Sequence, residues 1–410
     1  MPERVMIVTI DFNKRDSWPV EDIAAELEEL VTSCGGHIAW RMVCKCDKPT
    51  ANFLIGKGKV EEIADICVTG GIDTVIFSND LKGSQQRNLE EVVKVKTIDR
   101  TQLILDIFAR RAKSQEGKMQ VELAQLQYLL PRLTGKGVEL SRLGGGIGTV
   151  GPGETKLEVD RRRIADRIAK LKRDLKGVAQ DRKLTRKKRN ELKIPTVSLV
   201  GYTNAGKSTL LNALTDANQL TFDGLFTTLD PLSRQLILPN HQKIVLSDTV
   251  GFMYELPYHL IESFKATLEE VQEADLLLHV LDVSNPKFRN LHDAVMDVLK
   301  ELDSHDKPMV TVLNKIDKLK DKTWLKSLED NFPNSVSISA LKKENLSRLV
   351  EKISELLTPT MVEIDAKIPI NRMDLVSLAH KEGHVHSIEY SADSIHIRAA
   401  ISLKIASKFS

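Results

Sequence analysis

Long apolar runs, an export signal and a disulfide pattern are all missing from this chain of 410 residues. No uninterrupted apolar run approaches the roughly 18 residues that cross a bilayer, so no transmembrane segment is expected. The first sixteen residues lack a basic region followed by an apolar stretch, which argues against a secretory signal. All four cysteines lie in the first 70 residues. They indicate reduced thiols, and a cytoplasmic protein is expected.

The small net charge of +2 conceals one strongly basic segment. Residues 156–193 contain sixteen Lys or Arg and six Asp or Glu, a local net charge of +10, so the remainder carries −8. Such a segment suits a polyanionic partner, because cationic side chains neutralise phosphates well. A solvated helix face is the simpler alternative, since most charged runs are solvated helix faces.

Hydrophobic periodicity divides the chain into four parts. Residues 1–106 alternate β-branched strands with amphipathic stretches, which predicts an α/β subdomain with a parallel sheet. Residues 107–193 predict a helical hairpin: a helix to about residue 140, a glycine-rich loop over 143–153 and a basic helix. Residues 194–357 alternate five buried strands with helices, which predicts a second parallel sheet. Residues 358–410 predict a small α+β domain with a β-α-β-β order.

The motif GYTNAGKS at 201–208 predicts a phosphate-binding loop. It follows the strand IPTVSLV and opens the helix STLLNAL, the context in which backbone N–H groups wrap phosphates. Lys207 is expected to reach the β- and γ-phosphates, and Ser208 is expected to ligate Mg²⁺. The predicted phosphate-binding residues are Gly201, Tyr202, Thr203, Asn204, Ala205, Gly206, Lys207, Ser208 and Thr209.

Two further motifs follow later strands in the order that a guanine-nucleotide site requires. In DTVG at 248–251, Asp248 is expected to hold Mg²⁺ through water, and the N–H of Gly251 to sense the γ-phosphate. In NKID at 314–317, Asp317 can accept from two guanine nitrogens that adenine does not present. This carboxylate argues against an ATPase or a kinase.

The remaining base contacts complete a site for GTP and GDP. Asn314 is expected to meet the Hoogsteen side of the base, and Lys315 to cover its face. A backbone N–H in the SA motif, at 339–340, can meet guanine O6. All the motifs end strands, which is where an open α/β sheet binds its ligand. The nucleotide-binding residues expected here are Asp248, Thr249, Val250, Gly251, Asn314, Lys315, Ile316, Asp317, Ser339, Ala340 and Leu341.

The motifs together resemble the translation-factor-like branch of P-loop GTPases. The segment LFTTLDP at 225–231 resembles switch I of the Obg/HflX group. The segments ARRAKSQEGKMQVELAQLQYLLPRLTG and GGGIGTVGPGETKLEVDRRRI resemble signatures of HflX proteins. The resemblance implies a P-loop GTPase domain of the α/β class in which Thr228 ligates Mg²⁺ when the γ-phosphate is present. It adds Phe226, Thr227, Thr228, Leu229 and Asp230 to the nucleotide site.

Two residues depart from the Ras-type pattern. Phe252 stands where Ras-like proteins place the water-orienting glutamine, and a phenyl ring cannot direct a water. Slow intrinsic hydrolysis is therefore expected, with Lys207, Thr228 and Gly251 as the catalytic residues and the missing group supplied in trans, by water or by another ion. Asn204 matches the K⁺ ligand of some potassium-activated GTPases, or shapes the loop in a left-handed conformation; both readings stay open.

The resemblance also implies a partner. HflX proteins engage ribosomes, mainly the large (50S) subunit, so it implies splitting or rescue of stalled ribosomes under stress, with hydrolysis releasing the factor. A large-subunit assembly factor is an alternative with the same chemistry. A GTP-gated switch for a non-ribosomal protein or a membrane surface is another. The candidate contacts to ribosomal RNA are Arg161, Arg162, Arg163, Arg182, Lys187, Lys188, Arg189, Gly144, Gly145 and Gly146.

A second anion site is conceivable in the amino-terminal part. Residues 56–59, Gly-Lys-Gly-Lys, resemble an anion-binding turn before a helix. Some HflX proteins are linked with ATP binding outside the GTPase domain, which makes this turn the candidate ATP site. A turn with surface lysines is the simpler alternative. Nothing in the sequence resembles a dedicated dimer seam, so a monomer is expected.

Overall fold

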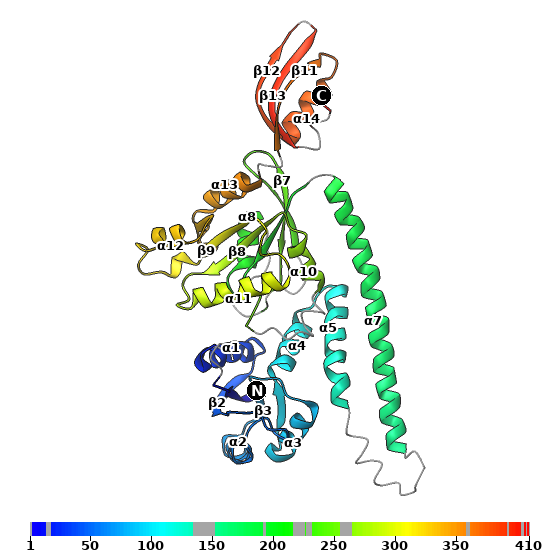
Figure 1. The fold of residues 1–410 in the computed structure, drawn as a ribbon, viewed down its shortest axis with the longest axis vertical. Helices are drawn as coiled ribbons and strands as arrows, with labels where there is room; N and C mark the ends of the chain where they lie inside the picture. Colours follow the sequence, from blue (N-terminus) through cyan, green and yellow to red (C-terminus); the bar gives the residue numbers. More distant parts are fainter. Residues whose placement is uncertain are drawn as a thin grey trace. The chain divides into compact units, whose positions relative to one another are not determined.

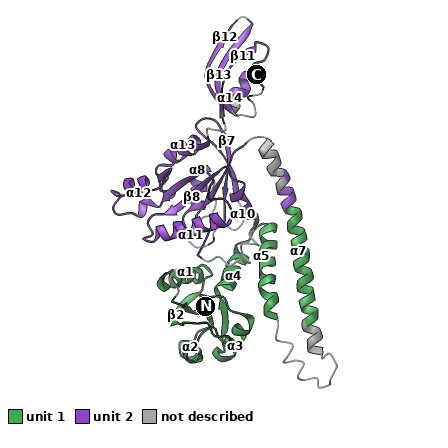
Figure 2. Ribbon diagram, in the orientation of Figure 1, with its two compact units in different colours: residues 1–178, 257–264 green, residues 179–256, 265–410 purple. Residues whose placement is uncertain are grey.

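The structure is a computed structural model that describes residues 2–13, 18–133, 152–191, 194–215, 226, 232–254, 265–357, 361–391, 393–402, 406 and 408–409. The described residues form two compact units, one up to Val178 and the other from Ala179 onward (Figure 2). Both units contain a parallel sheet with helices packed on it, which confirms the predicted α/β class (Figure 1). Within the described ranges, no helix combines the length and the apolar character that a membrane span needs.

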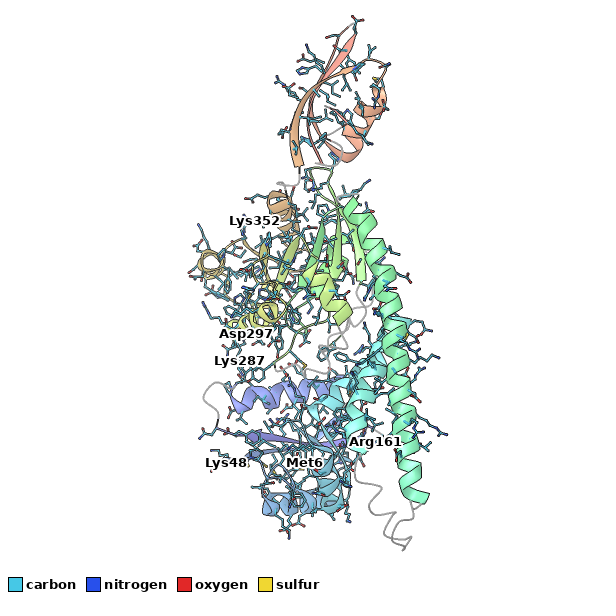
Figure 3. The ribbon with its side chains drawn as sticks, turned by 45° about the vertical axis from the view of Figure 1, so that its right-hand side comes forward. Met6, Lys48, Arg161, Lys287, Asp297 and Lys352 are labelled. Atoms are coloured by element: carbon cyan, nitrogen blue, oxygen red, sulfur yellow. The ribbon has the colours of Figure 1, made fainter. Side chains whose placement is uncertain are left out.

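The amino-terminal sheet is parallel and has the strand order β2-β1-β3-β4. Helices cover both of its faces, so a central residue such as Met6 on β1 is fully buried (Figure 3). The strands are β1 (Arg4–Asp11), β2 (His37–Lys45), β3 (Thr74–Phe77) and β4 (Lys96–Asp99). The helices are α1 (Val20–Ser33), α2 (Lys57–Gly70), α3 (Gly83–Val93) and α4 (Arg100–Arg111).

The predicted helix over residues 107–140 is wrong in its extent. The chain leaves the helical conformation after Arg111, and a new helix, α5 (Gln115–Leu129), begins after three intervening residues. Ser114 causes the new start, because its hydroxyl accepts a hydrogen bond of 2.8 Å from the N–H of Gly117 and so caps α5. A short 3₁₀ turn, η1 (Leu130–Leu133), follows, and residues 134–140 lie outside the described residues.

Helix α7 (Pro152–Glu191) forms a hairpin with α5, as predicted. Arg167 joins the two helices, because its Nε and Nη2 donate to the two carboxylate oxygens of Glu122 at 2.6 and 2.7 Å. The glycine-rich loop expected over 143–153 is two residues shorter than expected at its end, because Pro152 already begins the helix, a position where proline is well tolerated. The rest of that loop lies outside the described residues.

The second sheet has the order β10-β9-β8-β5-β7-β6 and carries the nucleotide motifs. The five expected strands are parallel, and β6, which the sequence analysis missed, joins β7 antiparallel at the edge. The strands are β5 (Thr196–Val200), β6 (Leu232–Ile237), β7 (Lys243–Asp248), β8 (Leu276–Asp282), β9 (Met309–Asn314) and β10 (Ser335–Ser337). The helices are α8 (Lys207–Thr215), α10 (Lys265–Gln272), α11 (Phe288–Glu301), η2 (Ile316–Lys318), α12 (Leu325–Asn331) and α13 (Leu346–Leu357).

The carboxyl-terminal part is the small α+β domain that the sequence predicts. Its antiparallel sheet has the order β11-β13-β12, and α14 packs on one face of it. The apolar residues of that face alternate along β13, with Ile395, Ile397, Ala399 and Ile401 all fully buried. The elements are β11 (Met361–Pro369), α14 (Met373–Glu382), β12 (Gly383–Tyr390) and β13 (Ser394–Ser402).

A histidine pair lies inside the second sheet domain. His279 on β8 is completely buried, and its Nδ1 lies 3.3 Å from Nδ1 of His292 on α11. Burial lowers the pKa of His279 to about 3, and the nearby His292 and Lys207 act in the same direction. Burial also lowers the pKa of His292. The folded protein therefore keeps both rings neutral at pH values at which the unfolded chain takes up protons.

This pair predicts loss of stability in mild acid. A histidine whose pKa is depressed by folding does not lower the free energy of unfolding at pH values above its unfolded pKa of about 6.5. As the pH falls below that value, His279 alone is expected to lower the free energy of unfolding by about 1.4 kcal/mol per pH unit. Urea denaturation at pH 7.5, 6.5 and 5.5 measures the slope. His279→Leu is expected to flatten it, whereas His305→Gln, at an exposed histidine, leaves it unchanged. An equally steep slope in His279→Leu would contradict the assignment.

Candidate functional site

The loop between β5 and α8 is shaped by two glycines that no other residue can replace. Gly201 has φ +151°, and a Cβ on it would lie 2.3 Å from the carbonyl oxygen of Val280. Gly206 has φ +98°, and a Cβ there would lie 2.4 Å from Nδ2 of Asn314. Both positions therefore combine a left-handed or strained backbone with close packing. The loop is pressed against the ends of β8 and β9.

Lys207 is the first residue of α8, and its own ammonium group lies inside this loop. Its Nζ donates to the carbonyl oxygens of Gly201 at 3.0 Å and Tyr202 at 2.9 Å, and its side chain is buried. Burial lowers the pKa of Lys207 to about 8, whereas the carboxylate of Asp248 opposes the shift. A phosphate at this ammonium would replace the lost hydration with negative charge.

Two oxygen donors suited to a magnesium ion meet beside Lys207. The hydroxyl of Ser208 donates to Oδ2 of Asp248 at 2.6 Å, and Asp248 ends β7 with only 1% of its surface exposed. Carboxylate and hydroxyl oxygens are ligands that Mg²⁺ prefers. The adjacent Thr249 is fixed by a hydrogen bond of 2.7 Å from its hydroxyl to the carbonyl of Leu199. The first part of the expected metal set is therefore already brought together by α8 and β7.

The segment after β7 is hydrogen-bonded directly to the phosphate loop. The N–H of Thr203 donates to the carbonyl of Phe252 at 2.8 Å, and the N–H of Phe252 donates to the carbonyl of Gly201 at 3.1 Å. Phe252 is 2% exposed, so the residue in the glutamine's place is packed inside the protein. A Cβ on Gly251 would lie 2.8 Å from Cα of Thr203 and 3.0 Å from Nζ of Lys207.

Asn314 ties the base-recognition motif to the phosphate loop. Its Nδ2 donates to the carbonyl of Ala205 at 2.9 Å, and its Oδ1 accepts from the N–H of Ala340 at 3.0 Å. One side chain thus connects β9, the phosphate loop and the turn after β10. Asp317 is oriented in the same region, because the hydroxyl of Ser339 donates to its Oδ1 at 2.6 Å.

Lys315 is held by an acidic residue that the sequence analysis missed. Its Nζ donates to the carbonyl of Asn204 at 2.7 Å and pairs with Oδ2 of Asp282 at 2.8 Å. Asp282 ends β8, so the rule that ligands bind at strand ends could have singled it out. Asn204 has φ +60°, the left-handed conformation expected of a loop-shaping asparagine.

Part of the predicted nucleotide site lies outside the described residues. This applies to Thr227, Thr228, Leu229 and Asp230, so the third expected magnesium ligand is not placed. Phe226 is described and is 2% exposed. Around the base, Ile316 is buried, whereas Leu341 is 72% exposed and lies at the surface. Thr209 lies in α8, directly after Ser208. Val250 lies two residues after Asp248, the last residue of β7.

The RNA candidates divide into three groups. Arg161, Arg162 and Arg163 are exposed on α7. Arg182 is half-buried and lies 3.6 Å from the carboxylate of Glu269 on α10, so α7 uses it for packing. The side chains of Lys187, Lys188 and Arg189, and the glycines Gly144, Gly145 and Gly146, lie outside the described residues.

The lysines of the amino-terminal turn at 56–59 pair with acids of α2. Lys57 lies 3.6 Å from the carboxylate of Glu61, and Lys59 lies 2.6 Å from that of Glu62. These are exposed pairs within one helix, which fits the reading of a turn with surface lysines.

Family models match most of the chain in three successive segments. Residues 21–109 match the "GTP-binding GTPase N-terminal" family and residues 111–189 the "GTP-binding GTPase Middle Region". Residues 196–315 match the family described as "50S ribosome-binding GTPase". The predicted phosphate loop, the expected magnesium donors and the first residues of the predicted base-recognition motif all fall within this third match.

Curated relatives match nearly the whole chain. The "GTPase HflX" of Alkalihalophilus pseudofirmus is 44% identical over 95% of this chain and 90% of its own. The "GTPase HflX" of Escherichia coli is 42% identical over 90% of this chain and 86% of its own. A solved GTP-binding protein from Sulfolobus solfataricus in complex with GDP is 27% identical, covers 88% of this chain and 99% of its own, and has a TM-score of 0.45.

Gly251→Ala is expected to impair hydrolysis more than nucleotide binding. Its methyl group would overlap Thr203 and crowd Nζ of Lys207, the end of the site expected to hold the γ-phosphate. We expect kcat for GTP to fall about tenfold or more, with GDP affinity within about threefold of the original. Steady-state hydrolysis and fluorescent GDP binding measure the two effects. Gly177→Ala on α7 is the control, because a Cβ there meets nothing within 4 Å. Unchanged kcat in Gly251→Ala would contradict the geometry.

Asp317→Asn is expected to change the base preference. The carboxylate is expected to accept from N1–H and the amine of guanine, and an amide cannot accept both, so GTP affinity should fall about 100-fold. Xanthosine triphosphate, with a carbonyl in place of the amine, should gain affinity. Competition binding with both nucleotides measures this. Asp321→Asn, an exposed residue four positions on, is the control. If Asp317→Asn keeps its preference for GTP, the base site is assigned wrongly.

Proposed function

Because the chain belongs to the HflX family of GTPases, we propose that it binds the large (50S) ribosomal subunit and splits or rescues stalled ribosomes under stress. GTP hydrolysis, which is the activity of the family, would drive its release from the ribosome. The observation that carries the proposal is a row of exposed cations on α7, in the part of the sequence that precedes a domain matching a family described as ribosome-binding.

The exposed cations follow α7 over more than four turns. Apart from Arg167, which pairs with Glu122, those with exposed side chains are Arg161, Arg162, Arg163, Lys170, Lys172, Arg173 and Lys176, and we call them the α7 cationic surface. Arg161 marks its beginning (Figure 3). The apolar residue Leu171 points the other way and is 1% exposed, so packing and charge occupy different faces of the helix. A rigid helix with cations on its free face suits a folded polyanion such as ribosomal RNA.

The nucleotide site would operate the switch that this binding needs. Lys207 and the loop amides would hold the phosphates, and Ser208 and Asp248 would hold Mg²⁺, together with Thr228. A bound Mg²⁺ neutralises charge on the β- and γ-phosphates. The N–H of Gly251 would donate a hydrogen bond to the γ-phosphate when GTP, but not GDP, is bound. Phe252 is buried and has no group that directs a water, so the ribosome would complete the catalytic site.

Several finer assignments belong to the same proposal. We propose a cytoplasmic monomer with domain boundaries near residues 106, 193 and 357. The left-handed backbone of Asn204 is by itself a reason for an asparagine at this position, whether or not an ion binds there. Replacing K⁺ with Na⁺ in the turnover assay decides whether the Asn204 side chain also ligates K⁺. An ATP site at residues 56–59 has less support, because both lysines are paired with glutamates.

GTP turnover with and without ribosomes tests the proposal. The purified protein should hydrolyse GTP slowly alone and much faster with 50S subunits or 70S ribosomes, and the stimulation should fade as salt is raised. Light scattering of 70S ribosomes then shows whether they split. Stimulation by immature particles alone would identify an assembly factor instead. Turnover that ribosomes do not change would indicate a switch for a non-ribosomal or membrane-surface partner.

The α7 cationic surface predicts a charge-reversal effect. Arg161→Glu/Arg162→Glu/Arg163→Glu should reduce ribosome stimulation about tenfold or more at moderate salt and leave intrinsic turnover unchanged, because each reversed phosphate contact repels. Lys300→Glu/Lys320→Glu/Lys326→Glu changes the net charge equally at exposed positions of the GTPase domain and is the matched control. Equal losses in both variants would show an effect of net charge, and no loss in the first would exclude α7 as the contact.

A further inference from the structure

Asp282 divides its carboxylate between two different partners. It is the last residue of β8 and lies in register with Asn314, the last residue of β9. Its Oδ1 accepts from the N–H of Ser284 at 3.0 Å and from the hydroxyl of Ser284 at 2.5 Å, which shapes the turn after β8. Its Oδ2 lies 2.8 Å from Nζ of Lys315. One oxygen therefore serves the backbone turn and the other serves the base-recognition motif.

Lys315 is fixed at both ends by this arrangement. Its backbone is left-handed, with φ +66°, and its Nζ donates to the carbonyl of Asn204 in addition to pairing with Asp282. The side chains of Lys315 and Asp282 are 16% and 17% exposed, so water and salt screen the pair less than a surface pair. A lysine with both ends held has few rotamers left, and its alkyl stem is ordered.

We propose that Asp282 is a positioning residue for guanine, acting through the ammonium of Lys315. Its charge orders the lysine stem before nucleotide binds, so the base meets a prepared surface and less conformational entropy is lost on binding. The base is the same in GTP and GDP, so Asp282 would govern how long both nucleotides are retained. The inference rests on the assignment of the base site to Lys315 and Asp317, and not on the ribosomal role.

Asp282→Asn separates the two functions of the carboxylate. An asparagine Oδ1 can still accept from Ser284, but an amide facing Lys315 carries no charge. We expect the release of fluorescent GDP and of a fluorescent non-hydrolysable GTP analogue to become faster by the same factor, about tenfold, with little change in association rate. At saturating GTP, kcat should stay unchanged. Stopped-flow displacement and steady-state turnover, both without ribosomes, measure these rates.

Two further variants show whether Asp282 acts through Lys315 or through the turn. Ser284→Ala removes the hydroxyl contact of the turn and keeps both the backbone contact and the ion pair, so nucleotide release should stay as in the original protein. Lys315→Met removes the ammonium, and adding Asp282→Asn to it should bring no further acceleration. Asp306→Asn, at a carboxylate that is 93% exposed in the same domain, controls for the loss of one charge.

The outcomes distinguish this inference from the base assignment on which it rests. Equal acceleration in Ser284→Ala and Asp282→Asn would show that the turn matters and the ion pair does not, which overturns the inference. Additive effects of Asp282→Asn and Lys315→Met would overturn it as well. If Asp282→Asn releases nucleotide at the original rate while Asp317→Asn loses GTP preference, the base site is right and the role of Asp282 is wrong. If Asp282→Asn does not fold, the comparison of Ser284→Ala with Lys315→Met decides the question. Slower or unchanged nucleotide release in Lys315→Met would show that the Lys315 ammonium does not help to retain the nucleotide, which would overturn a role of Asp282 that acts through it.

Discussion

Parallel pairing of the strands is the constraint on which the nucleotide site depends. Because β10, β9, β8, β5 and β7 all run in one direction, their carboxyl ends meet at one edge of the sheet. Residues separated by more than a hundred positions, such as Ala205 and Asn314, are thereby brought within hydrogen-bonding distance. In open α/β sheets covered by helices, this edge is where ligands bind.

The phosphate end and the base end of the site are one connected structure. Asn314 and Lys315 donate to the carbonyls of Ala205 and Asn204, two consecutive residues of the phosphate loop. The segment containing Phe252 adds a second set of backbone bonds from the other side. The loop is therefore held between the base-recognition motif and the segment after β7. A conformational change in the base-recognition motif or in the segment after β7 is therefore transmitted to the phosphate loop directly through these hydrogen bonds.

The sequence could indicate the motifs of this candidate site because each motif follows an apolar strand and has a strict internal spacing. It missed features that depend on contacts between distant residues. The end of a strand is a signal for Asp282, but its partner is known only once the register of β8 and β9 places Asp282 beside Lys315. The edge strand β6 escaped notice because four of its six residues are exposed and its apolar pattern is weak. The break before α5 carried a local signal, the capping Ser114, but the helical composition on both sides outweighed it.

The buried ammonium of Lys207 has a thermodynamic consequence beyond its expected contact with phosphate. With a pKa of about 8, part of the Lys207 amine is already uncharged in mildly alkaline solution before a nucleotide binds. A polyphosphate beside it favours the charged form, so the protein takes up a fraction of a proton when it binds GTP or GDP in mildly alkaline solution. Nucleotide affinity and proton affinity are thus linked at a single nitrogen. The heat of nucleotide binding will accordingly include the ionisation heat of whatever buffer supplies that proton.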